Sequence, residues 1–269
     1  MNETELLFTD ILNCQRHHLY LERDLLLNRE QRNFIRRALH KRIKAEPIQY
    51  ILGKAEFMGL VFRVNRHVFI PRPETEILVD IAVKFVSSLK PQVSKVSILD
   101  IGTGSGCIAV SLVKCLPQVE VEATDISPQA LEIARLNARL NKVGERIKFT
   151  VSDLFNSCDL RPATCDLIVS NPPYIPTPEI ENLEPEVRYE PRLALDAGKD
   201  GLDFYRRIIN ESPSYLKPDG LLIMEMGYAQ RQEIEKMIKK SNDFEVREIV
   251  KDYNKIDRVI VAKRKRRNG

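Results

Sequence analysis

The stretch Val96-Ser-Ile-Leu-Asp-Ile-Gly-Thr-Gly-Ser-Gly106 decides the fold of this chain of 269 residues. Its first half is an apolar run that ends in an acid, which is typical of a buried strand over 96–100. Alternating glycines then let the backbone turn sharply and approach a ligand closely. The apolar segment 107–116 follows and predicts a helix. A strand, a glycine loop and a helix in this order indicate a nucleotide-type α/β fold.

An acid follows this unit at the position that a nucleoside site requires. The next predicted strand, 119–124, ends in Asp125, which lies 19 residues after Gly106. An acid at the end of the second strand can hold both hydroxyls of a ribose. The spacing is Gly-x-Gly-x-Gly, unlike the Gly-x-Gly-x-x-Gly of pyrophosphate-binding dehydrogenases. A glycine turn alone is compatible with simple helix capping, but the loop and the acid together favour a nucleoside ligand.

Two further strands bring polar and aromatic groups to the same edge of the predicted sheet. The strand 147–151 is followed by Ser-Asp-Leu-Phe over 152–155, where an acid or an apolar side chain would lie beside an adenine. The strand 166–170 is followed by Asn171-Pro172-Pro173-Tyr174. Two prolines in a row cannot continue a central strand, so they form a rigid loop. In open α/β sheets this carboxyl edge is where ligands bind.

The chemistry that suits this loop is methyl transfer to a nitrogen that is not basic. Asn171 Oδ1 and the Pro172 carbonyl can both accept hydrogen bonds from an amide or exocyclic amine NH2 group. Tyr174 offers a flat face to a planar group. Such catalysis by positioning requires neither a metal nor a strong base. The alternative reading is a proline-rich turn without a catalytic role.

The remainder of the C-terminal region completes a predicted sheet of seven strands. Further strands are expected at 220–226, 244–250 and 258–262, and further helices at 73–88, 127–142, 202–215 and 231–240. The polar segment 175–203 is long for a plain connection, and such loops are often lids or binding loops. The basic run 263–267 reads as a disordered tail.

The N-terminal region reads differently. Residues 2–45 show helical periodicity, and Asn28 with Gln31 resembles a capping box. The helix after Asn28 is basic, which fits a solvated face or a surface for a partner. Pro47 is expected to end the helices, and 48–70 to form a hairpin. Glu74 and Glu76 fit helix capping after Pro73, with a site role left open.

The amino-acid composition argues against several classes of protein. A net charge of +4 permits contact with nucleic acid without demanding it. The histidines form no metal-ligand pattern, so no metal is expected. Neither a secretory signal nor an apolar run long enough for a bilayer is present. An odd number of cysteines without a Cys-x-x-Cys pattern predicts free thiols and a cytoplasmic protein, the cysteines being Cys14, Cys107, Cys115, Cys158 and Cys165.

Longer motifs carry a resemblance to a known family. They are Pro47-Ile-Gln-Tyr-Ile-Leu-Gly53, Ile70-Pro-Arg-Pro-Glu-Thr-Glu76, Glu190-Pro-Arg-Leu-Ala-Leu195 and Asp200-Gly-Leu-Asp-Phe-Tyr-Arg206. With the glycine loop and Asn171-Pro-Pro-Tyr174, the chain resembles the HemK/PrmC release-factor glutamine methyltransferases. The resemblance implies a class I Rossmann-like methyltransferase domain with a seven-stranded mixed sheet. It further implies a helical substrate-recognition domain at 1–46, a β-hairpin linker at 47–72 and the methyltransferase domain at 73–269.

The resemblance also implies an activity and a set of site residues. The family transfers a methyl group from S-adenosylmethionine to the side-chain nitrogen (N5) of the glutamine in the Gly-Gly-Gln loop of peptide-chain release factors, and so modulates translation termination. Asn171, Pro172, Pro173 and Tyr174 would hold the substrate amide, with Asn171, Pro172 and Tyr174 catalytic. The cofactor would contact Gly102, Thr103, Gly104, Ser105, Gly106, Asp125, Leu154 and Asn171. Ala197 and Lys255 depart from the family pattern, where glycine is usual, and Leu154 can pack on an adenine but not stack on it.

Three alternatives remain open. One is glutamine methylation of a ribosomal protein, and another is adenine-N6 methylation of nucleic acid. The lack of a recognition domain with a dense basic face argues against DNA as a partner. A third is a non-catalytic module that binds the release factor or ribosome, which would not require both the intact glycine loop and Asn171-Pro-Pro-Tyr174. Proximity to the ribosome is compatible with the first reading, and no membrane is involved in any of them.

Overall fold

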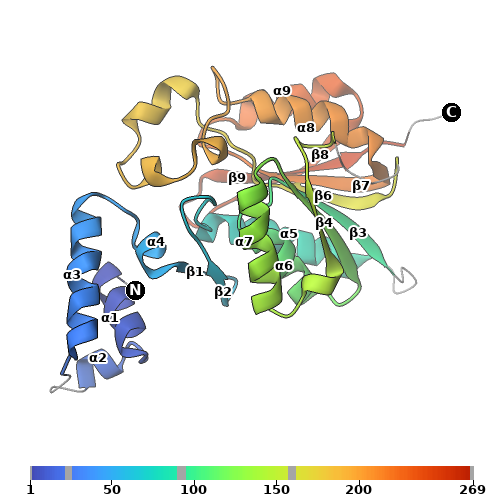
Figure 1. Cartoon of the computed structure of the whole chain (residues 1–269). Coiled ribbons are helices and arrows are strands. Elements are labelled where there is room, and N and C mark those ends of the chain that lie inside the picture. Colours follow the sequence, from blue (N-terminus) through green and yellow to red (C-terminus); the bar gives the residue numbers. More distant parts are fainter. Residues whose placement is uncertain (1, 22–25, 90–94, 157–161, 267–269) are drawn as a thin grey trace.

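A mixed sheet of seven strands forms the centre of the molecule (Figure 1). The structure is a computed structural model that describes residues 2–21, 26–89, 95–156 and 162–266. The strand order is β5-β4-β3-β6-β7-β9-β8, in which β9 is antiparallel to both of its neighbours and the other pairs are parallel. The strands are β3 (Val96–Ile101), β4 (Val119–Asp125), β5 (Ile147–Val151), β6 (Cys165–Ser170), β7 (Leu216–Glu225), β8 (Phe244–Lys251) and β9 (Asp257–Arg264).

Helices cover both faces of the sheet because its central strands are apolar on both sides. Along β3, Ile98 packs in the core with α5 and α6, whereas Leu99 packs in the core with α8 and α9. The period of two along a strand explains this alternation. The helices are α5 (Pro73–Ser88), α6 (Cys107–Cys115), α7 (Pro128–Leu140), α8 (Asp203–Glu211) and α9 (Arg231–Ser241). The predicted α/β class and the seven-stranded mixed sheet are confirmed.

The strand order reverses between β3 and β6, and this reversal positions the site. From β3 the chain moves outward through β4 and β5, and then returns to place β6 on the other side of β3. Consecutive loops therefore diverge at the carboxyl ends of these two strands and leave a crevice between them. The glycine loop follows β3, and Asn171-Pro-Pro-Tyr174 follows β6.

A small helical unit precedes the sheet and lies to one side of it (Figure 1). Its helices are α1 (Glu3–Leu12), α2 (His18–Leu21), α3 (Arg29–Ile43) and α4 (Ile48–Leu52). The predicted capping box of Asn28 and Gln31 is present, and each side chain accepts the other residue's backbone N–H at 2.9 Å. The expectation that Pro47 ends the helices is wrong, because α4 follows it and Ile48 packs against Leu7 and Ala38.

The hairpin starts later than expected and links the helical unit to the glycine loop. It consists of β1 (Lys54–Phe57) and β2 (Leu60–Arg63), which pair antiparallel. Asn137 on α7 accepts the Arg63 N–H at 2.6 Å and donates to the Ser105 carbonyl at 2.8 Å. The same buried amide therefore fixes both the end of the hairpin and the end of the glycine loop.

The segment between β6 and α8 crosses the carboxyl edge of the sheet, and we call residues 175–202 the strap. It contains the 3-10 helices Thr177–Asn182, Val187–Tyr189 and Arg192–Ala194. Glu190 on the strap is buried, accepts the Ile70 N–H at 2.8 Å and pairs with Arg72. The strap is thereby tied to the chain that enters α5.

The loop between β8 and β9 contains Lys255, one of the two residues that depart from the family pattern. Lys255 has a φ of +64°, which is a conformation that favours glycine.

The end of the described chain differs from the expected disordered tail. Lys263 and Arg264 belong to β9, and Lys263 Nζ lies 2.7 Å from Asp219 Oδ1. Arg266 also pairs with Asp219, at 2.5 Å. Arg267 and the thiol of Cys158 lie outside the described residues. Within the described ranges, no helix combines the length and the apolar character that a bilayer span requires.

Candidate active site

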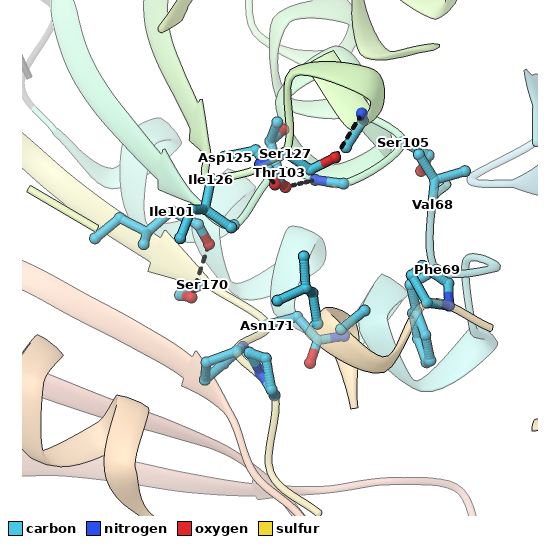
Figure 2. Close-up of a pocket in the computed structure, with 18 of the residues that line it drawn as sticks. Val68, Phe69, Ile101, Thr103, Ser105, Asp125, Ile126, Ser127, Ser170 and Asn171 are labelled. Carbon is cyan, nitrogen blue, oxygen red and sulfur yellow. Dashed lines mark hydrogen bonds between the residues drawn. The ribbon is translucent and has the colours of Figure 1, made fainter. Parts of the chain in front are cut away.

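A cavity of about 660 Å³ lies over the carboxyl ends of β3, β4 and β6. It runs from the glycine loop to the loop after β6, and Figure 2 shows Asp125 and Ser127 on one side of it and Asn171 on the other. The structure brings together ten of the residues predicted for the site, namely Gly102, Thr103, Gly104, Ser105, Asp125, Leu154, Asn171, Pro172, Pro173 and Tyr174. Gly106 does not line the cavity. A Cβ there would meet Ala134 Cβ at 3.1 Å, so this glycine allows α6 to pack closely on α7.

The glycine loop presents its backbone to the cavity. Gly102 and Gly104 have φ values of +71° and +55°, and a Cβ built on either would meet nothing within 4 Å. Between them, the Thr103 N–H donates to the Thr124 carbonyl at 2.9 Å, and Thr103 Oγ1 donates to Asp100 Oδ2 at 2.6 Å. Burial raises the pKa of Asp100 to about 7. These bonds hold the loop in a conformation in which Gly102 and Gly104 border open space in the described structure.

Asp125 closes this end of the cavity. Its Oδ2 accepts the Gly104 N–H at 2.8 Å, and its Oδ1 accepts the Ser127 N–H at 2.9 Å. Burial raises the pKa of this carboxyl, while the backbone hydrogen bonds oppose that rise. A carboxylate has about four acceptor positions, so two backbone bonds leave capacity for a pair of hydroxyls. The geometry fits the diol of a ribose.

Apolar groups stand next to Asp125. Leu154 is buried in the cavity wall, and Ile126 beside Asp125 is half exposed. Leu154 has a φ of +54°, an uncommon conformation for a residue with a Cβ, and its carbonyl accepts the Ser152 hydroxyl at 2.9 Å. A planar apolar ligand group fits between such side chains, as an adenine requires. The Asp125 acceptor and the apolar wall together therefore suit an adenine nucleoside.

Asn171 stands at the opposite end of the cavity. Ser170 before it is anchored by a hydrogen bond from its hydroxyl to the Ile101 carbonyl at 2.8 Å, which is drawn in Figure 2. Asn171 Nδ2 donates to Thr75 Oγ1 at 3.1 Å. Among the described residues, none donates a hydrogen bond to Asn171 Oδ1 or to the Pro172 carbonyl. Two acceptors thus remain for a ligand that carries an NH2 group.

Tyr174 completes this end, and its backbone is braced from the residue that precedes α9. Gln230 Nε2 donates to the Tyr174 carbonyl at 2.8 Å and to the Gly201 carbonyl at 3.1 Å, and Gln230 Oε1 accepts the Gly227 N–H at 3.1 Å. One amide therefore joins the loop after β6, the strap and the chain after β7. Burial raises the pKa of the Tyr174 phenol to about 12, so it remains protonated at neutral pH.

Several residues around the cavity are not predicted from the sequence. Val68 and Phe69 lie beside it in Figure 2, and Thr75 lines it from the first turn of α5. The Pro-Arg-Pro-Glu-Thr-Glu motif is the available signal, but its acids point first to helix capping. Glu76 instead accepts the Met58 N–H at 2.6 Å and so holds the hairpin, whereas Thr75 reaches the site.

Comparison with known proteins identifies the family. The model of the PrmC N-terminal domain matches residues 1–53, and that of the methyltransferase small domain matches residues 76–182. The release factor glutamine methyltransferase of Geobacter sulfurreducens is 44% identical over 259 residues, which cover 96% of this chain and 87% of that protein. The chain belongs to the release factor glutamine methyltransferase family. The Fusobacterium nucleatum member is 42% identical and covers 97% of this chain and 73% of its own length.

The fold of this chain is also found among solved structures. A methyltransferase from Pyrococcus furiosus superposes with a TM-score of 0.57 at 17% identity, covering 88% of this chain and 99% of that one. At this identity the likeness concerns the fold alone. The N-terminal family model ends at residue 53, directly after α4. Its range therefore includes the short helix that the sequence pattern alone places in the hairpin.

Proposed function

We propose that this chain transfers a methyl group from S-adenosylmethionine to the side-chain nitrogen of the glutamine in the Gly-Gly-Gln loop of peptide-chain release factors. The observation that carries the proposal is the pair of acceptors, Asn171 Oδ1 and the Pro172 carbonyl, at the end of the cavity opposite Asp125. A primary amide brings two N–H donors, which match these two acceptors. Family membership supplies the release factor as the substrate to test.

Each end of the cavity has a distinct role in this reaction. S-adenosylmethionine, when bound, supplies a methyl carbon made electrophilic by the positive sulfonium. The Gly102 and Gly104 backbone, Asp125 and Leu154 would hold its nucleoside part. Asn171 and Pro172 would hold the glutamine nitrogen still and turn its lone pair away from the amide plane. Positioning of this kind can supply most of the rate enhancement of a transfer reaction.

No strong base lies against the proposed position of the nitrogen among the described residues. The Tyr174 phenol, with a pKa of about 12, does not take a proton at neutral pH. The side chain of Glu225, a buried carboxylate, is linked to Asn171 through the hydroxyl of Thr75. The side chains around the substrate therefore align it and exclude water, and Tyr174 adds a flat face against the planar amide.

The helical unit is proposed to recognise the release factor, with the hairpin as its linker to the transferase domain. It contacts the strap directly, since Arg42 Nη2 on α3 lies 2.6 Å from Glu186 Oε1 on the strap. A protein bound to these helices would thus lie next to the segment that borders the cavity. We infer a cytoplasmic site of action, close to translating ribosomes. The four described cysteines, which are all free thiols, support a reducing compartment.

The test is a methyl-transfer assay with labelled S-adenosylmethionine and a panel of acceptors. The panel contains a release factor, its Gly-Gly-Ala variant as the matched control, a ribosomal protein and DNA. Mass spectrometry locates the added methyl group. The proposal predicts label on the release-factor glutamine and none on the control. Label only on the ribosomal protein or on DNA would overturn the substrate, and no transfer despite cofactor binding would indicate a binding module.

A further inference from the structure

A buried hydroxyl connects the reaction loop to an acid at the end of β7, the strand that pairs with β6. Thr75 and Glu225 are each about 2% exposed. Thr75 Oγ1 donates to Glu225 Oε2 at 2.7 Å, and the same oxygen accepts from Asn171 Nδ2 at 3.1 Å. The three residues come from α5, β7 and the loop after β6. None of the roles described above accounts for burying a carboxylate here.

While Glu225 is ionised, the hydrogens available to these three side chains fix the direction of the Asn171 amide. A threonine hydroxyl has one hydrogen, whereas an ionised carboxylate only accepts hydrogen bonds. Once the Thr75 hydrogen is committed to Glu225, the Thr75 oxygen can only accept. Asn171 must then present its NH2 group to Thr75 and its Oδ1 atom away from it. The reversed amide would leave Thr75 without a donor and would place two donors where the substrate brings its own.

We propose that Thr75 and Glu225 are positioning residues that fix the amide of Asn171, so that the loop selects a substrate carrying an NH2 group over one carrying only acceptors. This inference rests on the proposed function, because it assigns the acceptor atom of Asn171 to the glutamine amide. Thr75 and Glu225 act through Asn171 and touch neither reacting atom.

The surroundings of Glu225 make the orientation of the Asn171 amide sensitive to pH. Among the described residues, no cation forms an ion pair with it, and the nearby Arg258 is bonded to Asp252 and to the Met226 carbonyl. Burial raises the pKa of Glu225 to about 7, partly offset by the Thr75 hydrogen bond and Arg258. The titratable and charged groups around it are Arg72, Glu74, Cys107, Tyr174, Tyr205 and Arg258. Once protonated, Glu225 can donate to Thr75, which then donates to Asn171 Oδ1 and turns the amide.

Three variants test this positioning. Thr75→Val keeps the shape but removes the hydroxyl, Thr75→Ser restores the hydroxyl, and Ser111→Ala removes a buried hydroxyl that has no partner in the described structure. Thr75→Val is expected to lower kcat on a release factor by about 10- to 100-fold, the cost of one charge-assisted hydrogen bond. Cofactor affinity, measured by calorimetry, stays at the wild-type value and shows that the variant is folded. Ser111→Ala keeps wild-type kcat, and Thr75→Ser recovers most of it.

Two readouts separate positioning from a merely structural effect. In the wild-type enzyme kcat should fall as the pH drops below about 7, following the raised pKa of Glu225, and Glu225→Gln should remove this dependence. The side-chain amide signals of Asn171, followed by 15N NMR on the full chain without substrate, should shift in Thr75→Val and with pH, but not in Ser111→Ala.

The outcomes distinguish the inference from the function on which it rests. An unshifted Asn171 amide signal together with wild-type kcat in Thr75→Val would overturn the positioning role. The proposed function would stand, because the release factor is still methylated. A shifted amide in an enzyme that leaves the release-factor glutamine unmodified would instead overturn the proposed function while supporting the network.

Discussion

The two ends of the cavity are built in different ways. At the glycine end, hydrogen bonds join residues that are 2 positions apart at Asp125 and Ser127, 3 apart at Asp100 and Thr103, and 21 apart at Gly104 and Asp125. At the acceptor end the separations are 56 from Tyr174 to Gln230, 96 from Thr75 to Asn171 and 150 from Thr75 to Glu225. The first end uses mainly backbone donors within one βαβ unit, with the Thr103 hydroxyl and the Asn137 amide of α7 as side-chain additions. The second end uses side chains brought together by the sheet.

This difference assigns separate tasks to the two ends. A loop held mainly by bonds between residues close in sequence depends little on distant strands, which suits the binding of a common cofactor. The acceptor end is assembled from α5, β7, the loop after β6 and Gln230 just before α9. It therefore depends on the whole domain and can select one substrate amide in one orientation. Changes at the glycine end should therefore alter cofactor affinity, and changes at the acceptor end should alter the transfer rate.

The largest expected effect is that of Asn171→Ala. Removal of the amide deletes one of the two acceptors that hold the substrate nitrogen, so kcat should fall by about 10²- to 10³-fold, as when a preorganised polar group is lost elsewhere. Cofactor affinity, from calorimetry, should remain nearly intact. Asn141→Ala, at the end of α7, is the control. Equal losses of rate and cofactor affinity would contradict the role given to Asn171.

Asp125→Ala should produce the opposite pattern. Two hydroxyls would lose a charged acceptor, and each such bond is worth about 1.5–3 kcal/mol, so the Kd for cofactor should rise by at least about tenfold. At saturating cofactor, kcat should change little. Asp219→Ala, which removes a carboxylate paired with Lys263 outside the cavity lining, is the matched control. Unchanged affinity would show that Asp125 does not hold the ligand.

A smaller effect is expected for Gln230→Ala, which touches no substrate. Loss of the Gln230 amide would remove its hydrogen bonds to the Tyr174 and Gly201 carbonyls and to the Gly227 N–H. We expect kcat to fall by roughly tenfold and the free energy of unfolding by about 1–3 kcal/mol. Steady-state kinetics and denaturant unfolding measure these quantities. A loss of stability without any loss of kcat would remove Gln230 from the positioning of the loop.

The smallest effect concerns stability at different pH. Because burial raises the pKa of Glu225 from 4.5 to about 7, the folded protein holds this proton more tightly than the unfolded chain. The resulting stabilisation is complete below pH 4.5 and is lost as the pH rises through 7. Glu225→Gln stays neutral, so its Tm should exceed that of the wild type by a few degrees at about pH 8 and match it near pH 4.5. An equal difference at both pH values would exclude this origin.

The same contrast explains which features the sequence can predict. The strands and helices of the transferase domain and the residues of the glycine end follow from apolar periodicity, glycine spacing and an acid at a fixed distance, all of which are local. Asn171 is also recognisable, because two prolines after a buried strand mark a loop at the ligand-binding edge. Local patterns are therefore sufficient to place Asn171, Asp125 and the glycine loop in one site.

The remaining features depend on contacts that no local pattern encodes. Glu225 follows the apolar run 221–224 at the end of β7 (Leu216–Glu225), and only the sheet order brings it to Thr75. Gln230, just before α9, gives no signal of its partners in the loop after β6 and on the strap. The helix α4 escapes prediction because Pro47 suggests a terminator, although proline also fits the start of a helix. Packing of Ile48 on the other N-terminal helices then stabilises this short element.

The most direct test of separate construction is a double-mutant cycle on cofactor binding. The Kd for S-adenosylmethionine would be measured by calorimetry for the wild type, Asn171→Ala, Asp125→Ala and the double variant. Independent ends predict that Asp125→Ala weakens binding by the same factor in both backgrounds, with a coupling energy below about 0.5 kcal/mol. A coupling energy above about 1 kcal/mol would contradict the account, because it would mean that the two ends act as one unit.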